Sequence, residues 1–113
     1  MSAPLIVAAV QCAAIFDDVA GASAHILSCA TEAAAAGARL IVFPEAYLQG
    51  HSYRAELVAQ RALTIDNATI IALAEALAPL RIMAVIGFFE RRGALLHNSA
   101  MIIEGGRIVG CYG

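Results

Sequence analysis

The feature that most constrains this fold is an apolar, β-branched run that stops at a proline and is followed by a single carboxylate. Residues 40–43 (LIVF) are followed by Pro44 and Glu45. Proline has no backbone N–H and fixes φ, so it ends a central strand. We therefore expect Glu45 just past the carboxyl end of a buried strand, where α/β sheets form their ligand crevices. A carboxylate there either has a chemical task or caps the following turn or helix, and its position alone leaves both open.

The composition indicates one small domain, or a piece of a larger one, with surfaces that need covering. Apolar residues make up 61% of the 113 residues, which excludes a disordered tail. Charged residues make up only 14%, which is little for a chain with so much surface relative to its volume. We infer that more chain or a partner covers part of it. The net charge of −2, with no basic cluster, argues against nucleic-acid binding.

No segment has the pattern of a membrane span. The apolar run 62–80 is interrupted by Asp66 and Glu75. The uncharged first sixteen residues lack the basic region that opens a signal peptide, and residues 4–10 are better interpreted as a first buried strand. The sequence therefore predicts a protein without a membrane anchor.

The cysteines indicate a reducing compartment. Cys12, Cys29 and Cys111 are odd in number, and their spacing does not match a metal site. Free thiols with structural roles are the default in such a protein, so we expect a cytoplasmic location and no metal or other cofactor.

Hydrophobic periodicity predicts alternating strands and helices that end in a hairpin. The expected strands span residues 4–10, 39–43 and 82–88. The expected helices run from Asp17 or Asp18 to about Ala36, over residues 54–62, and from Asn67 to near Pro79. Two further apolar runs flank Gly105-Gly106, a pair typical of a tight hairpin. The order predicts parallel strands with helical crossovers, followed by antiparallel strands.

Four segments, in register, carry a resemblance to a known family. They are VAAVQ (7–11), ATEAAAAGARLIVFPEAYLQG (30–50), IMAVIGFFERRGALLHNSAMII (82–103) and EGGRIVGCY (104–112). Together they resemble the amino-terminal part of the nitrilase superfamily, the carbon–nitrogen hydrolases. The resemblance implies an α/β fold: the amino-terminal portion of an αββα sandwich, with a mixed sheet and helices on one face.

The resemblance also implies a Glu-Lys-Cys mechanism in which Glu45 matches the general base. The glutamate takes a proton from a cysteine thiol, and the thiolate attacks an amide carbonyl or a nitrile carbon. The lysine stabilises the tetrahedral oxyanion. The amine or ammonia leaves, and the glutamate activates the water that hydrolyses the thioester. The implied partner is a small-molecule, amide-type substrate, and no cofactor is involved.

Two of these three groups match no residue of this chain. The family's lysine follows an aromatic–basic pair after the hairpin; Tyr112 matches the aromatic position, and Gly113 stands where arginine is usual. The sequence contains no lysine, since all seven of its basic residues are arginine. The family's cysteine lies further along the chain, on a strand-to-helix turn. We therefore expect residues 1–113 to be an incomplete carbon–nitrogen hydrolase domain, truncated before the catalytic lysine and cysteine.

Such a chain is expected to be inactive alone and to self-associate or form a homo-oligomer. The alternative is a non-catalytic α/β interaction module derived from the same fold. An unrelated α/β binding domain is a third possibility, although the sequence has no glycine-rich phosphate loop.

Three further residues are candidates for supporting roles. Glu90 either supports the active site or forms a salt bridge, with Arg91, Arg92 or Arg39 as partner. His51 and Tyr53 either line the substrate pocket or cover the loop. The segment GHSYRAE (50–56) lacks the proline that nitrilases tend to carry there, which favours amides or N-carbamoyl compounds over nitriles. For Asn98 and Ser99, polar residues in an apolar run, we expect internal hydrogen bonds.

Overall fold

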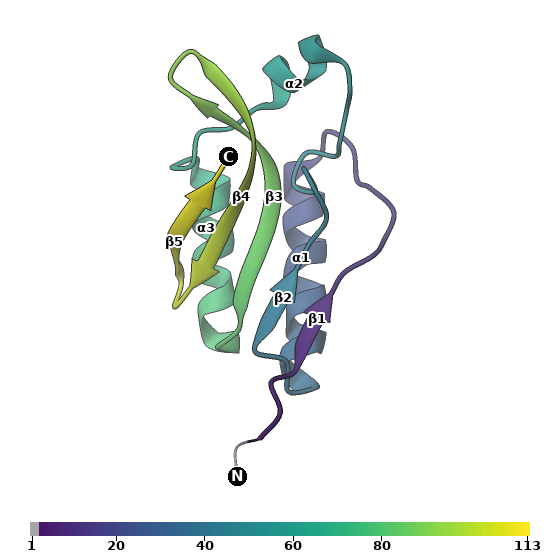
Figure 1. Ribbon diagram of the computed structural model, residues 1–113, viewed down its shortest axis with the longest axis vertical. Helices are drawn as coiled ribbons and strands as arrows, with labels where there is room; N and C mark the ends of the chain where they lie inside the picture. Colours follow the sequence, from purple (N-terminus) through teal and green to yellow (C-terminus); the bar gives the residue numbers. More distant parts are fainter. Residues whose placement is uncertain (1–2) are drawn as a thin grey trace.

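The chain forms a five-stranded mixed sheet with helices (Figure 1), as predicted from its sequence. The computed structural model describes residues 3–113. The strands follow one another in the sheet in the order β1-β2-β3-β4-β5. In chain order the elements are β1 (Val7–Ala9), α1 (Val19–Ala35), β2 (Leu40–Val42), α2 (Ala55–Arg61), α3 (Ala68–Leu77), the 3₁₀ turn η1 (Ala78–Leu80), β3 (Met83–Arg92), β4 (Leu95–Glu104) and β5 (Arg107–Tyr112).

The sheet joins a parallel half to an antiparallel half. Strand β2 pairs in parallel with both β1 and β3, whereas β3, β4 and β5 form an antiparallel meander. The predicted hairpin is present: Gly105 and Gly106 take φ values of +63° and +81°, which a tight two-residue turn requires. Strands β3 and β4 are ten residues long and pair well beyond the end of β2, so they lie beside the turn that carries Glu45.

The largest differences from the predicted strand boundaries are in β1 and β3, whereas β2 is one residue shorter at each end than the predicted 39–43. Strand β1 is only three residues long, not the whole of 4–10, because it lies at the edge of the sheet with a single neighbour. Strand β3 runs on to Arg92, not to residue 88, and turns at Gly93 into β4. The charged residues Glu90–Arg92 break the apolar pattern by which strands are recognised, although the backbone pairing continues through them.

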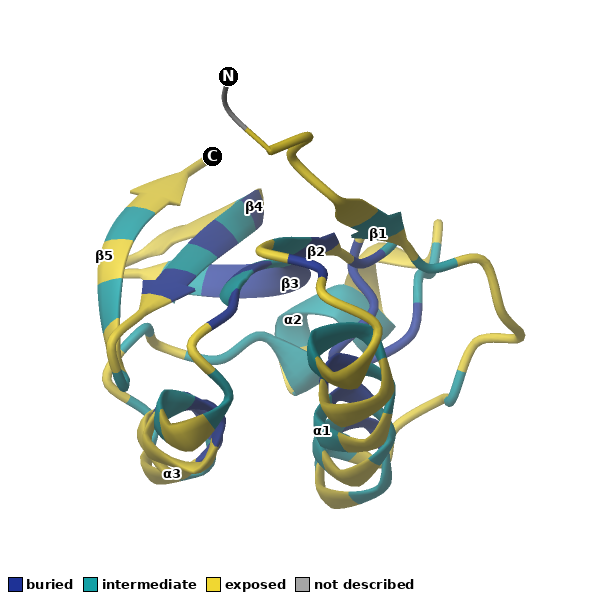
Figure 2. Cartoon of the chain, turned by 90° about the horizontal axis from the view of Figure 1, so that it is seen from below, coloured by how far each residue is buried: buried dark blue, intermediate teal, exposed yellow. Residues whose placement is uncertain are grey.

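Both longer helices begin at the capping residues that the sequence indicated. The Asp18 carboxylate accepts a 2.9 Å hydrogen bond from the Gly21 N–H, and the Asn67 side chain accepts one of the same length from Thr69. Figure 2 shows α1 and α3 on the same face of the sheet. Across residues 3–113 no helix is long and apolar enough to cross a membrane.

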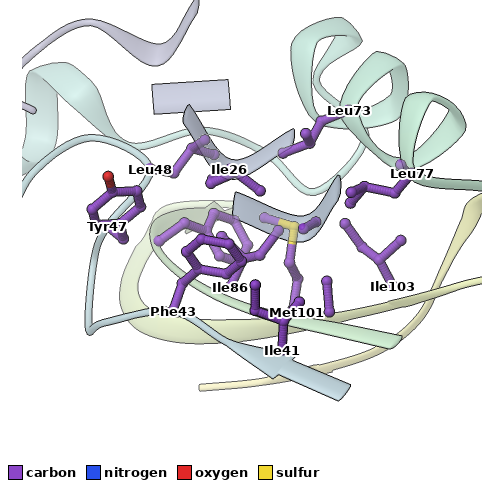
Figure 3. Packing of buried hydrophobic residues seen from close by; sticks show 14 of the residues in the cluster. Ile26, Ile41, Phe43, Tyr47, Leu48, Leu73, Leu77, Ile86, Met101 and Ile103 are labelled. Atoms are coloured by element: carbon purple, nitrogen blue, oxygen red, sulfur yellow. The ribbon is translucent and has the colours of Figure 1, made fainter. Parts of the chain in front are cut away.

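The core lies between that helical layer and the sheet (Figure 3). Alternate positions of the strands point into it, as the two-residue period of a strand requires. Its fully or almost fully buried members include Ile26 on α1, Leu73 and Leu77 on α3, and Ile41, Ile86, Met101 and Ile103 on the sheet.

No element of residues 3–113 covers the opposite face of the sheet. Val42 is 39% exposed there, and its register neighbour Val85 is only partly buried. On the edge strand β1, Val7 is 55% exposed. An apolar sheet face with an open edge is a ready surface for strand pairing between chains.

We therefore predict that the isolated chain self-associates at low micromolar concentration. Sedimentation velocity should show species larger than the monomer, and Val7→Lys, which places a charge on the edge strand, should shift them towards the monomer. A monomeric unaltered chain that unfolds in one sharp transition would contradict this prediction.

Candidate active site

The candidate site is built on the turn that follows β2. Pro44 ends the strand, and residues 45–49 form a continuous turn. Ala46 takes a left-handed φ of +49° although it is completely buried, which is a strained conformation for a residue with a Cβ. Tyr47 and Leu48 are buried behind it, and the Leu48 N–H bonds the Gly87 carbonyl of β3 at 3.1 Å. The turn therefore directs Glu45 outward while its neighbours enter the core.

Strand β3 passes this turn at very short range, at Gly87. A Cβ added to Gly87 would lie 2.5 Å from the Pro44 carbonyl oxygen, 2.6 Å from the Ala46 nitrogen and 2.9 Å from the Glu45 Cα. No side chain fits in that space, so this position in β3 needs glycine. The backbone of Glu45 is thereby pressed against the strand.

Gln49, which the sequence analysis did not single out, fastens the other end of the turn to β3. Its side chain is fully buried. The amide nitrogen donates to the Phe89 carbonyl at 2.9 Å and to the Arg61 carbonyl at 3.3 Å, and the amide oxygen accepts from the Phe89 N–H at 3.0 Å. The only sequence signal was a single amide directly before Gly50, at the end of the turn, and such a residue cannot be told from a surface residue until the partner strand is known.

Both oxygens of the Glu45 carboxylate have a neighbour. Asn98 on β4 donates a short hydrogen bond from Nδ2 to Oε1, and the His51 Nε2 lies 3.4 Å from Oε2. The Glu45 side chain remains 64% exposed. Within residues 3–113 the carboxylate thus bonds a side chain of another strand and does not cap the turn or a helix. Asn98 makes the internal hydrogen bond expected from sequence, with Glu45 as its partner.

His51 is held in place by aromatic neighbours. Its ring lies edge-on to Tyr53 at 4.7 Å between centroids and 5.9 Å from Phe89 on β3. Tyr53 is 97% exposed, so it touches His51 only at its edge and projects into the solvent. Of the two predicted pocket residues, the structure brings His51 to the carboxylate and leaves Tyr53 on the surface beside His51.

A shallow groove of about 310 Å³ lies beside Glu45 at the carboxyl end of β2, on the uncovered face of the sheet. Asn98 and Tyr112 form its far side, and Val42 and Val85 line its floor. A larger hollow of about 550 Å³, near Arg39 and Glu104, lies at the opposite ends of the strands. We take the smaller groove as the candidate site because it contains the carboxylate and follows the rule for α/β sheets.

Glu90 belongs to a separate polar cluster. It is 2% exposed, and its Oε1 accepts from the Ser99 hydroxyl and from Arg92, each at 2.7 Å. The Arg92 guanidinium lowers the pKa of Glu90, with burial acting in the opposite direction. The salt bridge to Arg92, one of the two alternatives from sequence, is therefore present. Strand alternation puts Glu90 on the other face from Phe89 and Asn98, so it does not touch Glu45.

The three cysteines lie away from the carboxylate. Among the described contacts, the Cys12 sulfur bonds Tyr47, the Cys29 sulfur lies beside His25, and the Cys111 sulfur bonds Glu90. The structure therefore brings together Glu45, His51 and Asn98, and none of the cysteines.

Comparison with known proteins identifies the class to which this fold and site belong. The family model of carbon–nitrogen hydrolases matches residues 6–112. The chain therefore belongs to the carbon–nitrogen hydrolase family, as its motifs suggested.

Curated relatives in this family include two nitrilases. A nitrilase of Pseudomonas syringae pv. syringae is 32% identical over 92% of this chain, and an aliphatic nitrilase of Rhodococcus rhodochrous is 29% identical over 87% of it. The matched regions make up 34% and 30% of those proteins. The chain thus spans about a third of the length of the relatives it matches.

Solved structures show the same fold at lower identity. An amidase from Nesterenkonia sp. superposes with a TM-score of 0.76 at 21% identity, covering 94% of this chain and 41% of the amidase. An N-terminal amidase with a Gln-Gly peptide gives a TM-score of 0.71 at 18% identity, covering 92% of this chain and 26% of that one. The arrangement of strands and helices is therefore that of amidase and nitrilase folds.

The role of Gln49 can be tested by its effect on stability. Gln49→Met keeps the length of the side chain but leaves the buried Phe89 N–H without its partner, while the Phe89 carbonyl keeps the Leu63 N–H at 3.0 Å; the loss should cost about 1–3 kcal/mol. Gln60→Met, on the exposed face of α2, is the matched control and should change stability by less than about 0.5 kcal/mol. Urea unfolding followed by circular dichroism measures both. Equal stability of the two variants would show that Gln49 does not hold the turn.

Proposed function

We propose that Glu45 is the general base of a carbon–nitrogen hydrolase site that acts on small amide-type substrates. The observation that carries the proposal is the carboxylate at the end of β2, oriented by Asn98 and His51 and facing an open groove. The position also matches the glutamate of the family's FPE motif, in a family to which the chain belongs.

The contacts of Glu45 suit a base that acts twice. Asn98, which also lines the groove, bonds Oε1, whereas Oε2 has His51 at 3.4 Å and accepts no hydrogen bond from Asn98, so Oε2 can take a proton. In the first half-reaction it accepts the proton of a cysteine thiol, and in the second it activates the water that hydrolyses the thioester. A carboxylate whose rotamer is fixed by two neighbours has less orientational freedom to lose when the substrate binds.

This chain supplies one part of that machinery. It has no lysine, and its three sulfurs contact other groups. We propose that the lysine and the nucleophilic cysteine come from residues outside this sequence, and that residues 1–113 alone do not hydrolyse C–N bonds. The uncovered face beside the groove is where such residues would have to meet Glu45.

For the substrate, we propose amides or N-carbamoyl compounds, because residues 50–56 lack the proline that nitrilases tend to carry there. Nitriles are a second candidate, favoured by the names of the curated relatives. The two differ in the reacting carbon, while the role of Glu45 is the same in both.

The test is a hybrid in which this chain replaces the matching part of the Pseudomonas syringae nitrilase. Glu45→Gln in the hybrid should reduce kcat by about three orders of magnitude or more while leaving the thermal transition in place, since a base of both half-reactions is lost. Glu104→Gln, an exposed glutamate of the β4–β5 hairpin, is the matched control and should retain activity. The unmodified 113-residue chain should release ammonia no faster than buffer.

The same hybrid distinguishes the two substrate classes. Its ratio of amide to nitrile turnover should exceed that of the unaltered nitrilase, since only the exchanged part differs. An unchanged ratio would favour nitriles. Full activity of the Glu45→Gln hybrid would refute the role of Glu45 with either class.

A further inference from the structure

A second group of reactive side chains lies on the helical side of the turn, away from Glu45. It consists of Cys12 in the loop after β1, Tyr47 in the turn after β2, and His25 and Cys29 on α1. The Cys12 thiol donates to the Tyr47 hydroxyl at 3.3 Å, and that hydroxyl lies 2.5 Å from the His25 Nδ1. The Cys29 sulfur lies 3.6 Å from the His25 Nε2. We call these four residues the thiol–imidazole cluster.

The hydrogen bonds of the cluster have one consistent direction. The Tyr47 oxygen accepts from Cys12, so its own proton is free for the His25 Nδ1, which accepts it when the neutral imidazole carries its proton on Nε2. Figure 3 shows the Tyr47 ring at the margin of the core with its hydroxyl pointing away from the other side chains. Burial and the Cys12 contact raise the pKa of Tyr47, so it stays a neutral phenol with a proton to donate.

This arrangement can take the proton from Cys12. If the thiol proton passes to the Tyr47 oxygen while Tyr47 gives its own proton to Nδ1, the result is a Cys12 thiolate that accepts a hydrogen bond from Tyr47. The His25 imidazolium then lies directly behind the phenol. Both changes stabilise the charged sulfur, and hydrogen bonds to charged groups are the strong ones.

The other two thiols lack these features. Burial raises the pKa of Cys29, which lies on the helix and is half-covered. Burial and the neighbouring Glu90 carboxylate raise the pKa of Cys111. Cys12 is exposed. Its sulfur bonds the neutral Tyr47 hydroxyl, which in turn contacts the His25 imidazole as a base.

The geometry points to Cys12 as a thiol-modification site for small disulfides, activated through Tyr47 by His25. The Cys12 thiolate attacks one sulfur of a low-molecular-weight disulfide, whose S–S bond breaks as a mixed disulfide with Cys12 forms. The Cys12 sulfur is oxidised, and the leaving sulfur is reduced and takes up the proton held on His25. This site is independent of the proposed role of Glu45.

The titratable groups that bear on the cluster come from all the elements around it. They are Tyr47 on the turn, and His25, Cys29 and Glu32 on α1; Glu32 acts on Cys29 by charge. The Glu32 carboxylate also raises the pKa of Cys29, so Cys29 is the poorer candidate for the attacking thiolate.

The test uses the whole chain and 4,4′-dithiodipyridine, with the modified cysteine identified by mass spectrometry between pH 5 and 10. We expect Cys12 to react faster than Cys111 at pH 7. Tyr47→Phe keeps the ring in the core but removes the donor, so the pH midpoint of the Cys12 rate should rise by about one unit. Below the midpoint the rate should fall about threefold, because a smaller thiolate fraction is partly offset by a more nucleophilic sulfur.

His25→Gln is a second variant, on the half-buried side of α1. It leaves the Tyr47 ring untouched and should also raise the pH midpoint of the Cys12 rate. Tyr53→Phe removes an exposed hydroxyl elsewhere and should leave it unchanged. A purely structural role would alter the maximal rate but not the midpoint. An unchanged midpoint in both variants would overturn the proposal, as would recovery of a Cys12–Cys29 disulfide in place of the mixed disulfide.

Discussion

The structure depends on one close approach between backbones. Strand β3 passes the turn after β2 at Gly87, where an added Cβ would lie 2.5 Å from the Pro44 carbonyl oxygen and 2.9 Å from the Glu45 Cα. Beside this contact, the Leu48 N–H bonds the Gly87 carbonyl and Ala46 adopts a left-handed conformation. A strained, buried residue persists only where its surroundings determine it fully. In this turn, the strained conformation accompanies a carboxylate, Glu45, that is held at the open end of the sheet.

The turn after β2 carries different groups on its two faces. On the uncovered face Glu45 meets Asn98 and His51, beside a groove that more chain or a partner can close. On the helical face Tyr47 joins a cysteine and a histidine that the proposed hydrolytic reaction does not use. The turn after β2 thus places Glu45 on one side of the sheet and Tyr47 on the other. The low charge of the chain is consistent with a face that is meant to be buried.

Much of this could be predicted from the sequence, because the relevant signals are local. The strand stop at Pro44, the Asp18 and Asn67 caps and the Gly105-Gly106 hairpin each follow from the chemistry of a few neighbouring residues. What could not be predicted depends on register between distant segments. Asn98 reaches Glu45 only because Phe89 pairs with Asn98, and Gln49 matters only because β3 continues to Phe89, beyond its predicted end.

The most direct test of this account measures the Glu45–Asn98 contact when the close approach is removed. In a Val7→Lys background, which is expected to be monomeric, the Asn98 side-chain amide resonances in ¹⁵N NMR spectra should change as acid protonates the carboxylate, and adding Glu45→Gln should abolish the change. Gly87→Ala should abolish it as well while the resonances of α1 and α3 persist, because the new Cβ displaces the turn. Gly110→Ala is the control, since a Cβ there meets Ile102 at an ordinary 3.4 Å. An Asn98 response that survives Gly87→Ala unchanged would contradict the claim that this contact positions the carboxylate.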